Sequence, residues 1–289
     1  MDPTPILHGT IAALAFVVLA HRPLSSAPLG LAGAVLLGLG FGVAHVLGWV
    51  ALNGAPPLAP TTAAQWLLYL VPAAALVTVA ERRPSGVAAV TLLRLVLVSA
   101  FLALNLGPVA EYREWSGREY ALHFAALAAT GIWTMQVAGW LADRSGDPSQ
   151  DEESDRGGGL APCLSLMVWG GLCAGLLGTT SSVSALTLGG MNTFFGVGCV
   201  VALIRPGKAL WSGVVAPFTF AAWALLFIAT FYGAVEELPA GLMLLAPLGG
   251  VIPLGSLAGI RLAVVRVLLI GLVGGLALYL GWPEPSPYY

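Results

Sequence analysis

Long apolar runs with few charges follow one another along this chain of 289 residues. Each run is about 17 to 25 residues long, which is the length that spans roughly 30 Å of hydrocarbon as an α-helix. Only 9% of the residues are charged, whereas a soluble domain carries about 25%, so the chain lacks the side chains to cover a water-facing surface. The runs are continuous and do not alternate with polar residues, as the strands of a membrane barrel do. We therefore predict an all-α integral membrane protein.

The apolar runs predict a polytopic bundle of about ten transmembrane helices. The run at 239–257 contains Pro247 and Pro253, each of which removes an internal hydrogen bond of a helix, so this helix should be kinked or broken. That run and the short first one are the least regular, and nine spans are therefore an alternative. The expected spans are roughly 5–21, 29–52, 62–80, 86–108, 118–142, 161–178, 184–204, 210–235, 239–257 and 259–282.

Basic residues are concentrated in every second loop, which is the pattern of the positive-inside rule. Arg82 with Arg83, and Arg205 with Lys208, are two examples. The alternation predicts a multi-pass protein of the cell (inner) membrane with both termini extracytoplasmic and the loop 143–159 cytoplasmic. The loop 109–118 is an exception, because it carries two arginines together with two glutamates.

One hydrophilic segment, residues 143–160, divides the chain into two groups of about five spans each, 1–142 and 161–289. The segment contains Gly, Pro, Ser and six acidic residues between Asp143 and Gly159, a composition typical of a disordered linker. An odd number of spans in each group would make the groups antiparallel, as in inverted-repeat transporters. The sequence shows no convincing internal match, so the repeat stays an open question.

Polar residues gather at the expected outer ends of the early spans. Histidines and a carboxylate at one depth suit a proton relay, a polar substrate pocket or a metal site. The alternative is that they are interfacial residues that meet water. No metalloenzyme spacing such as H-E-x-x-H accompanies them, so we assign no metal. This candidate outer polar cluster consists of His45, Asn53, Asn105, Glu119 and His123.

A second set of polar residues lies about two turns inside the expected cytoplasmic face. Arg94 and Arg266 are costly at this depth unless they pair or extend to the interface. Gln136 lies at a similar depth and is a candidate partner of Arg94. The three residues are candidate contacts of an anion or a lipid headgroup, and two arginines that extend to the interface are the alternative.

The rest of the sequence limits the partners. No phosphate-binding loop, nucleophile elbow or C-x-x-C motif is present, the chain has no basic patch for nucleic acid, and no cofactor is indicated. The lipid bilayer is the expected environment. G-x-x-x-G pairs indicate close helix packing within the bundle, or contact with a membrane-protein partner or a second copy. The pairs are Gly38/Gly42, Gly171/Gly175 and Gly271/Gly275.

Three functional hypotheses follow. The first is a small carrier or permease-like transporter of unknown substrate, which rests on the span count, the interrupted helix and polar residues at two depths. The second is a non-catalytic membrane subunit or scaffold of a larger complex. The third is a membrane enzyme that acts on a lipid-linked substrate at the outer face, with Glu111, Glu114 or Glu119 and His123 as acid or base. The absence of a catalytic motif favours a protein that is not an enzyme.

Overall fold

The computed structural model describes residues 31–82, 87–143, 160–204, 213–252 and 259–283, and within these ranges the chain is helical without β-strands. The helices are α2 (Leu31–Asn53), α3 (Ala63–Arg82), α4 (Val87–Tyr112), α5 (Gly117–Asp143), α7 (Leu160–Gly178), α8 (Ser182–Ile204), α9 (Val215–Phe231), α10 (Glu237–Leu245), α11 (Leu248–Val251) and α12 (Gly259–Leu280).

The helices follow the apolar runs of the sequence. Their ends lie within a few residues of the expected ones from α2 to α8 and at α12, while α9 is shorter than its apolar run. The expected span 5–21 and the linker lie outside the described residues, apart from the linker's two end residues. Five helices are long and apolar enough to cross a membrane, namely α4, α5, α7, α8 and α12. The all-helical architecture is therefore as predicted.

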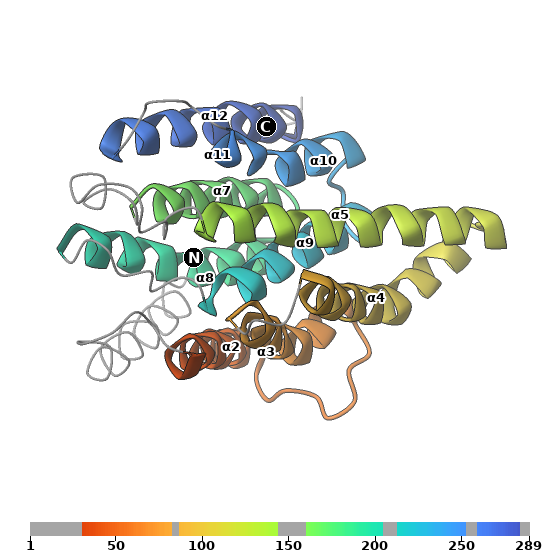
Figure 1. The fold of residues 1–289 in the computed structure, drawn as a ribbon. Helices are drawn as coiled ribbons and strands as arrows, with labels where there is room; N and C mark the ends of the chain where they lie inside the picture. Colours follow the sequence, from red (N-terminus) through yellow and green to blue (C-terminus); the bar gives the residue numbers. More distant parts are fainter. Residues whose placement is uncertain (1–30, 83–86, 144–159, 205–212, 253–258, 284–289) are drawn as a thin grey trace.

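Helix α9 forms the centre of the bundle. Every residue from Val215 to Phe227 is buried, as expected of a helix that is apolar on all sides. It contacts α2, α3, α4 and α5 as well as α7, α8 and α10. Figure 1 shows α2 and α3 on one side of it and the α10–α12 segment on the other. The two groups of helices on either side of the linker therefore share one core.

Close helix contacts occur where the sequence places small residues. A Cβ added at Gly38 of α2 would lie 2.8 Å from the Gly213 carbonyl oxygen, and one at Gly42 would lie 2.9 Å from Pro72 of α3. This glycine pair therefore packs within the bundle. A Cβ added at Gly271 or Gly275 of α12 would have no atom of a neighbouring residue within 4 Å. This pair therefore makes no close helix contact among the described residues.

Helices α7 and α8 are joined by the amide of Asn192. Its Nδ2 donates a hydrogen bond to the Met167 carbonyl oxygen over 2.8 Å, and its Oδ1 lies against the backbone of Gly170. A Cβ at Gly170 would come within 2.5 Å of both Asn192 Oδ1 and Phe218 Cζ. Glycine is therefore required here for the close approach of the two helices.

The predicted interruption near Pro247 is present. Helix α10 ends at Leu245, and α11 begins at Leu248. The short α11 packs against α12 and α5, where Gly249 approaches the backbone of Ile270. Neighbouring helices thus cover the interrupted segment, which is what such a break would need inside a membrane.

Many large apolar side chains point outwards. On α4 and α12, residues such as Val96, Leu104, Leu268 and Leu272 are between 41% and 72% exposed. A soluble monomer rarely exposes apolar surface on this scale. These faces suit contact with lipid, which is consistent with a multi-pass membrane protein.

Candidate functional site

Two interhelical connections meet at one end of the bundle. The α4–α5 turn carries Arg113, whose guanidinium lies 3.5 Å from the carboxylate of Glu237 in the first turn of α10. The same guanidinium lies over the ring of Phe231 at the end of α9, 5.4 Å from its centroid. Because both connections are expected on the outer side of the membrane, we call this the outer end.

The N-terminus of α5 at the outer end is closed by a capping box. The backbone N–H and the hydroxyl of Ser116 each donate to Glu119 Oε2 over 2.8 Å, and the Glu119 N–H donates to Ser116 Oγ over 3.3 Å. This reciprocal pair satisfies N–H groups that a helix start otherwise leaves open. The structure thus gives the Glu119 carboxylate a capping role.

His123 lies one turn further along α5 and is held by two contacts. Its Nδ1 is 2.8 Å from the Glu119 carbonyl oxygen, and its ring stacks on Trp115 with the centroids 3.9 Å apart and the planes at 14°. A carbonyl oxygen only accepts hydrogen bonds, so Nδ1 carries a proton. In the neutral imidazole, Nε2 is then a hydrogen-bond acceptor.

A groove with a cavity of about 210 Å³ begins beside His123. Its walls come from α5, α9 and α10, and most of its lining atoms are apolar. The aromatic rings of Trp223, Phe227 and Phe231 line the α9 side, and Glu237 stands on the α10 side. We refer to this space as the outer groove.

The polar side chains of the outer groove use their donors within the protein. Trp223 Nε1 donates to Thr130 Oγ1 over 3.3 Å. The hydroxyl of Thr130 donates in turn to the Leu127 carbonyl oxygen over 2.9 Å, and Thr230 donates to its own helix over 2.9 Å. What these side chains offer to a ligand is therefore hydrogen-bond acceptors.

The first two residues of the predicted outer polar cluster lie away from this groove. His45 on α2 is only 5% exposed, and neither ring nitrogen has a hydrogen-bond partner. The backbone of Leu67 on α3 faces its ring without the geometry of a hydrogen bond. Helix α2 does not line the groove. Asn53 at the end of α2 donates to the Trp49 carbonyl oxygen over 3.1 Å.

Asn105, the third member of the cluster, bridges α4 and the end of α9. Its Nδ2 donates to the Phe101 carbonyl oxygen over 2.7 Å, and its backbone carbonyl oxygen accepts a hydrogen bond from the Tyr232 hydroxyl over 2.5 Å. Among the hydrogen bonds of the described residues, the one from His123 to Glu119 alone joins two members of the cluster. The structure brings these two together within α5 and shows no contact that gathers all five.

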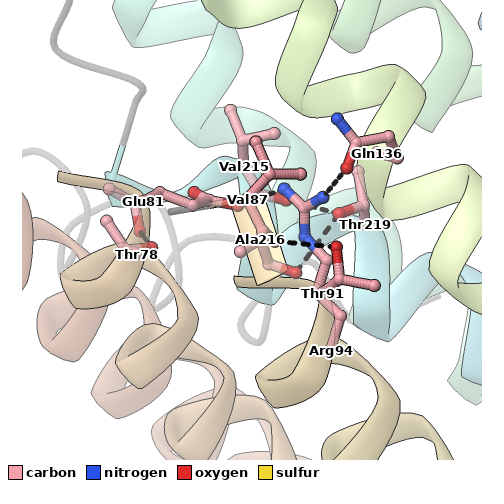
Figure 2. A network of polar contacts seen from close by, with 10 residues as sticks. Thr78, Glu81, Val87, Thr91, Arg94, Gln136, Val215, Ala216 and Thr219 are labelled. Carbon is pink, nitrogen blue, oxygen red and sulfur yellow. Dashed lines mark hydrogen bonds and ion pairs between the residues drawn. The ribbon is translucent and has the colours of Figure 1, made fainter. Parts of the chain in front are cut away.

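The opposite end of the bundle contains a buried polar network around Arg94 (Figure 2). The guanidinium of Arg94, on α4, forms an ion pair with Glu81 of α3, with Nη2 2.5 Å from Oε1. It also donates a hydrogen bond to Gln136 of α5. Gly139 leaves room for it, because a Cβ there would lie 3.1 Å from Nη2.

The network around Arg94 is balanced in charge. Arg94 is 3% exposed, and Glu81 supplies one negative charge against its positive one. The contact with Gln136, suggested by the sequence, is present, but the ion pair reduces the attraction for an external anion. Arg266 is also buried, on α12, which packs mainly against α7, α10 and α11.

No group of three or more His, Cys, Asp or Glu side chains capable of holding a metal ion occurs in the described part of the chain. The three cysteines are free and buried.

Sequence reasoning missed two residues that the geometry makes prominent. Glu81 has no role in the sequence-based predictions, although an acid one hairpin away from Arg94 is a natural partner. Glu237, the partner of Arg113, has no role in them either. A local signal for the α5 cap was also available, since Ser116 and Glu119 have the S-x-x-E spacing of a capping box.

Comparison of the chain with family models, with curated proteins and with solved structures finds no match in any of the three.

Proposed function

We propose that this protein is a multi-pass membrane carrier that binds a small amphipathic molecule in the outer groove. The observation that supports the proposal is the groove itself, a space of about 210 Å³ with mostly apolar walls and a few polar side chains among its lining residues. Ligand sites are commonly concave and mostly apolar, with a few polar groups that orient the ligand. Five helices are long and apolar enough to cross a membrane, and an amphipathic molecule would enter the groove from the surrounding lipid.

A second candidate is a membrane enzyme that acts on a lipid-linked substrate at the outer face. It is favoured by His123, whose Nδ1 is fixed by a backbone carbonyl so that Nε2 is left to act as an acceptor or base. The groove lining contains no serine or cysteine nucleophile, and a carrier therefore remains our first choice.

Binding and uptake of a neutral amphiphile test the carrier proposal. We expect the purified protein in lipid nanodiscs to bind tritiated hexyl β-glucoside, and proteoliposomes to accumulate it faster than empty liposomes do. Gly241 lines the groove, and a Cβ there meets nothing within 4 Å. Gly241→Leu should therefore fill the space and weaken binding about tenfold, or about 1.4 kcal/mol.

Gly189→Leu is the matched control. Gly189 also has open space around its Cβ position, but it lies on α8, which does not line the groove. This variant should bind and take up the probe like the parent protein. Equal effects of the two leucines, or no saturable binding in the parent, would contradict the proposal. Binding without uptake would leave a ligand-binding subunit or enzyme in place of a carrier.

A further inference from the structure

We propose that the ligand of the outer groove is a lipophilic ammonium ion, an apolar chain that carries one permanent positive charge. This inference rests on the proposed function, because it names the chemical class that the same groove would accept. It is based on three independent properties of the site: its hydrogen-bond character, its aromatic walls and its local charge.

The hydrogen-bond character excludes ligands that depend on donors from the groove side chains. The donors of Trp223, Thr130, Thr230 and His123 Nδ1 are used within the protein. The side-chain groups left over include hydroxyl lone pairs and the Glu237 carboxylate, which accept hydrogen bonds. An anionic headgroup such as a sulfate or phosphate would find few partners among them and would be repelled by the carboxylate.

The aromatic walls favour a cation. Trp223, Phe227 and Phe231 line one side of the groove, and ring faces attract positive charge, most strongly where water is excluded. The site already shows this preference, because the guanidinium of Arg113 lies 5.4 Å from the centroid of Phe231. An ammonium ion could make the same contact from inside the groove.

The charge at the outer end has the complementary sign. Residues 111–119 and 236–237 together contain five glutamates and two arginines, which is an excess of negative charge. The ion pair between Arg113 and Glu237 is long, and its side chains are 39% and 70% exposed. Exposed pairs of this kind contribute little free energy, so an incoming cation can share or replace Arg113 as the partner of Glu237.

The size of the cavity selects a free amphiphile over a membrane lipid. A space of about 210 Å³ is below the usual range of drug-sized pockets, roughly 300 to 1,000 Å³. It has room for one short chain and not for the two acyl chains of a choline lipid. We therefore infer a single-chain ammonium compound.

The test compares three probes that share one hexyl chain and differ in the headgroup. Hexyltrimethylammonium, hexyl β-glucoside and hexyl sulfate are titrated against the protein in nanodiscs made of uncharged lipid. We expect the ammonium probe to bind at least about fivefold more tightly than the glucoside, and the sulfate to bind most weakly. Equal affinities, or tightest binding of the sulfate, would overturn the inference while leaving the carrier proposal intact. Failure of all three probes to bind would contradict the carrier proposal itself.

Charge variants test whether the preference for the ammonium headgroup arises at Glu237. Glu237→Gln should weaken binding of the ammonium probe about two- to fivefold and leave the glucoside unchanged, whereas Arg113→Gln should strengthen ammonium binding by a similar factor. Unchanged glucoside binding shows that each variant is folded. Glu111→Gln removes the same charge from the same end without touching the groove lining, and should have less effect than Glu237→Gln. Equal effects of the Glu237→Gln and Glu111→Gln variants would overturn a direct contact with Glu237.

A competition experiment tests the number of chains. Competition by dihexanoyl-phosphatidylcholine as strong as that by the ammonium probe would overturn the single-chain assignment.

Discussion

Arg94 and Glu81 form an ion pair between α4 and α3, in which the two side chains are buried to different degrees. The side chain of Arg94 is 4% exposed and that of Glu81 is 22% exposed. Removal of either partner leaves the other with an unbalanced charge, but the cost depends on whether the remaining charge can reach water. Glu81 can reach water more easily than Arg94.

The two single variants should therefore differ in stability. Glu81→Gln leaves the Arg94 guanidinium buried without its counter-charge, and we expect a loss of about 3 kcal/mol in the free energy of unfolding. Arg94→Met should lose less than half of that, because Glu81 is left nearer to water. Equilibrium unfolding in mixed micelles, with increasing fractions of a denaturing detergent, measures both. The double variant should be more stable than Glu81→Gln alone, and the reverse order would show that the pair does not determine stability in this region.

Adjacent glycines on α7 provide a comparison of packing. Gly170→Ala would place a Cβ 2.5 Å from Asn192 Oδ1 and from Phe218 Cζ. We expect it to lower the free energy of unfolding by about 1 to 3 kcal/mol, the usual cost of overpacking. Gly171→Ala is the control, because its nearest contact would be at 3.7 Å, and alanine favours the helix by up to about 1 kcal/mol. Similar losses at the two positions would mean that α7 and α8 separate to admit the methyl group.

The sequence was sufficient to predict most of the described helices, because an apolar run largely determines its own length and boundaries. It was not sufficient to predict which helices are neighbours. The central position of α9, for example, depends on its contacts with helices from both groups of the chain, and a uniformly apolar run does not reveal its partners. Lateral neighbours in lipid are selected by packing and polar contacts and not by hydropathy.

The candidate sites were predictable to different extents for the same reason. Glu119 and His123 are one helical turn apart, so their proximity follows from local geometry. Their grouping with His45 required knowledge of how α2 and α5 are placed, and the structure gives those residues separate surroundings. Arg94 and Gln136 were paired correctly because they lie at equal depth, but depth alone did not identify the stronger partner Glu81. The outer groove arises from three helices together and left no motif in the sequence.

The α4–α5 turn contains a residue in the left-handed backbone region. Glu114 has φ of 54°, where side chains with a Cβ are disfavoured relative to glycine. We expect Glu114→Gly to be more stable than Glu114→Ala by about 1 kcal/mol, measured by the same unfolding titration. At the exposed helical position Ala121 the order should be reversed, with Ala121→Gly less stable than the parent by a similar amount. If glycine were disfavoured relative to alanine at position 114 as it is at position 121, the turn would not be strained.

Accessibility of single cysteines tests the predicted membrane orientation. The α4–α5 and α9–α10 connections meet through Arg113 and Glu237, so residues 114 and 236 must lie on the same side of any membrane that the bundle crosses. The positive-inside pattern places that side outside the cell and the loop 143–159 in the cytoplasm. The native cysteines are free and buried, and they should contribute little background to labelling by a membrane-impermeant maleimide.

In intact cells, cysteines at 114 and 236 should be labelled and one at 150 should not, with all three labelled after permeabilisation. Labelling of the cysteine at 150 alone in intact cells would show that the orientation is the opposite of the predicted one, without contradicting the fold. Labelling of 114 without 236 would place the two connections on opposite sides and would contradict the arrangement of α4, α5, α9 and α10 from which the outer groove is built.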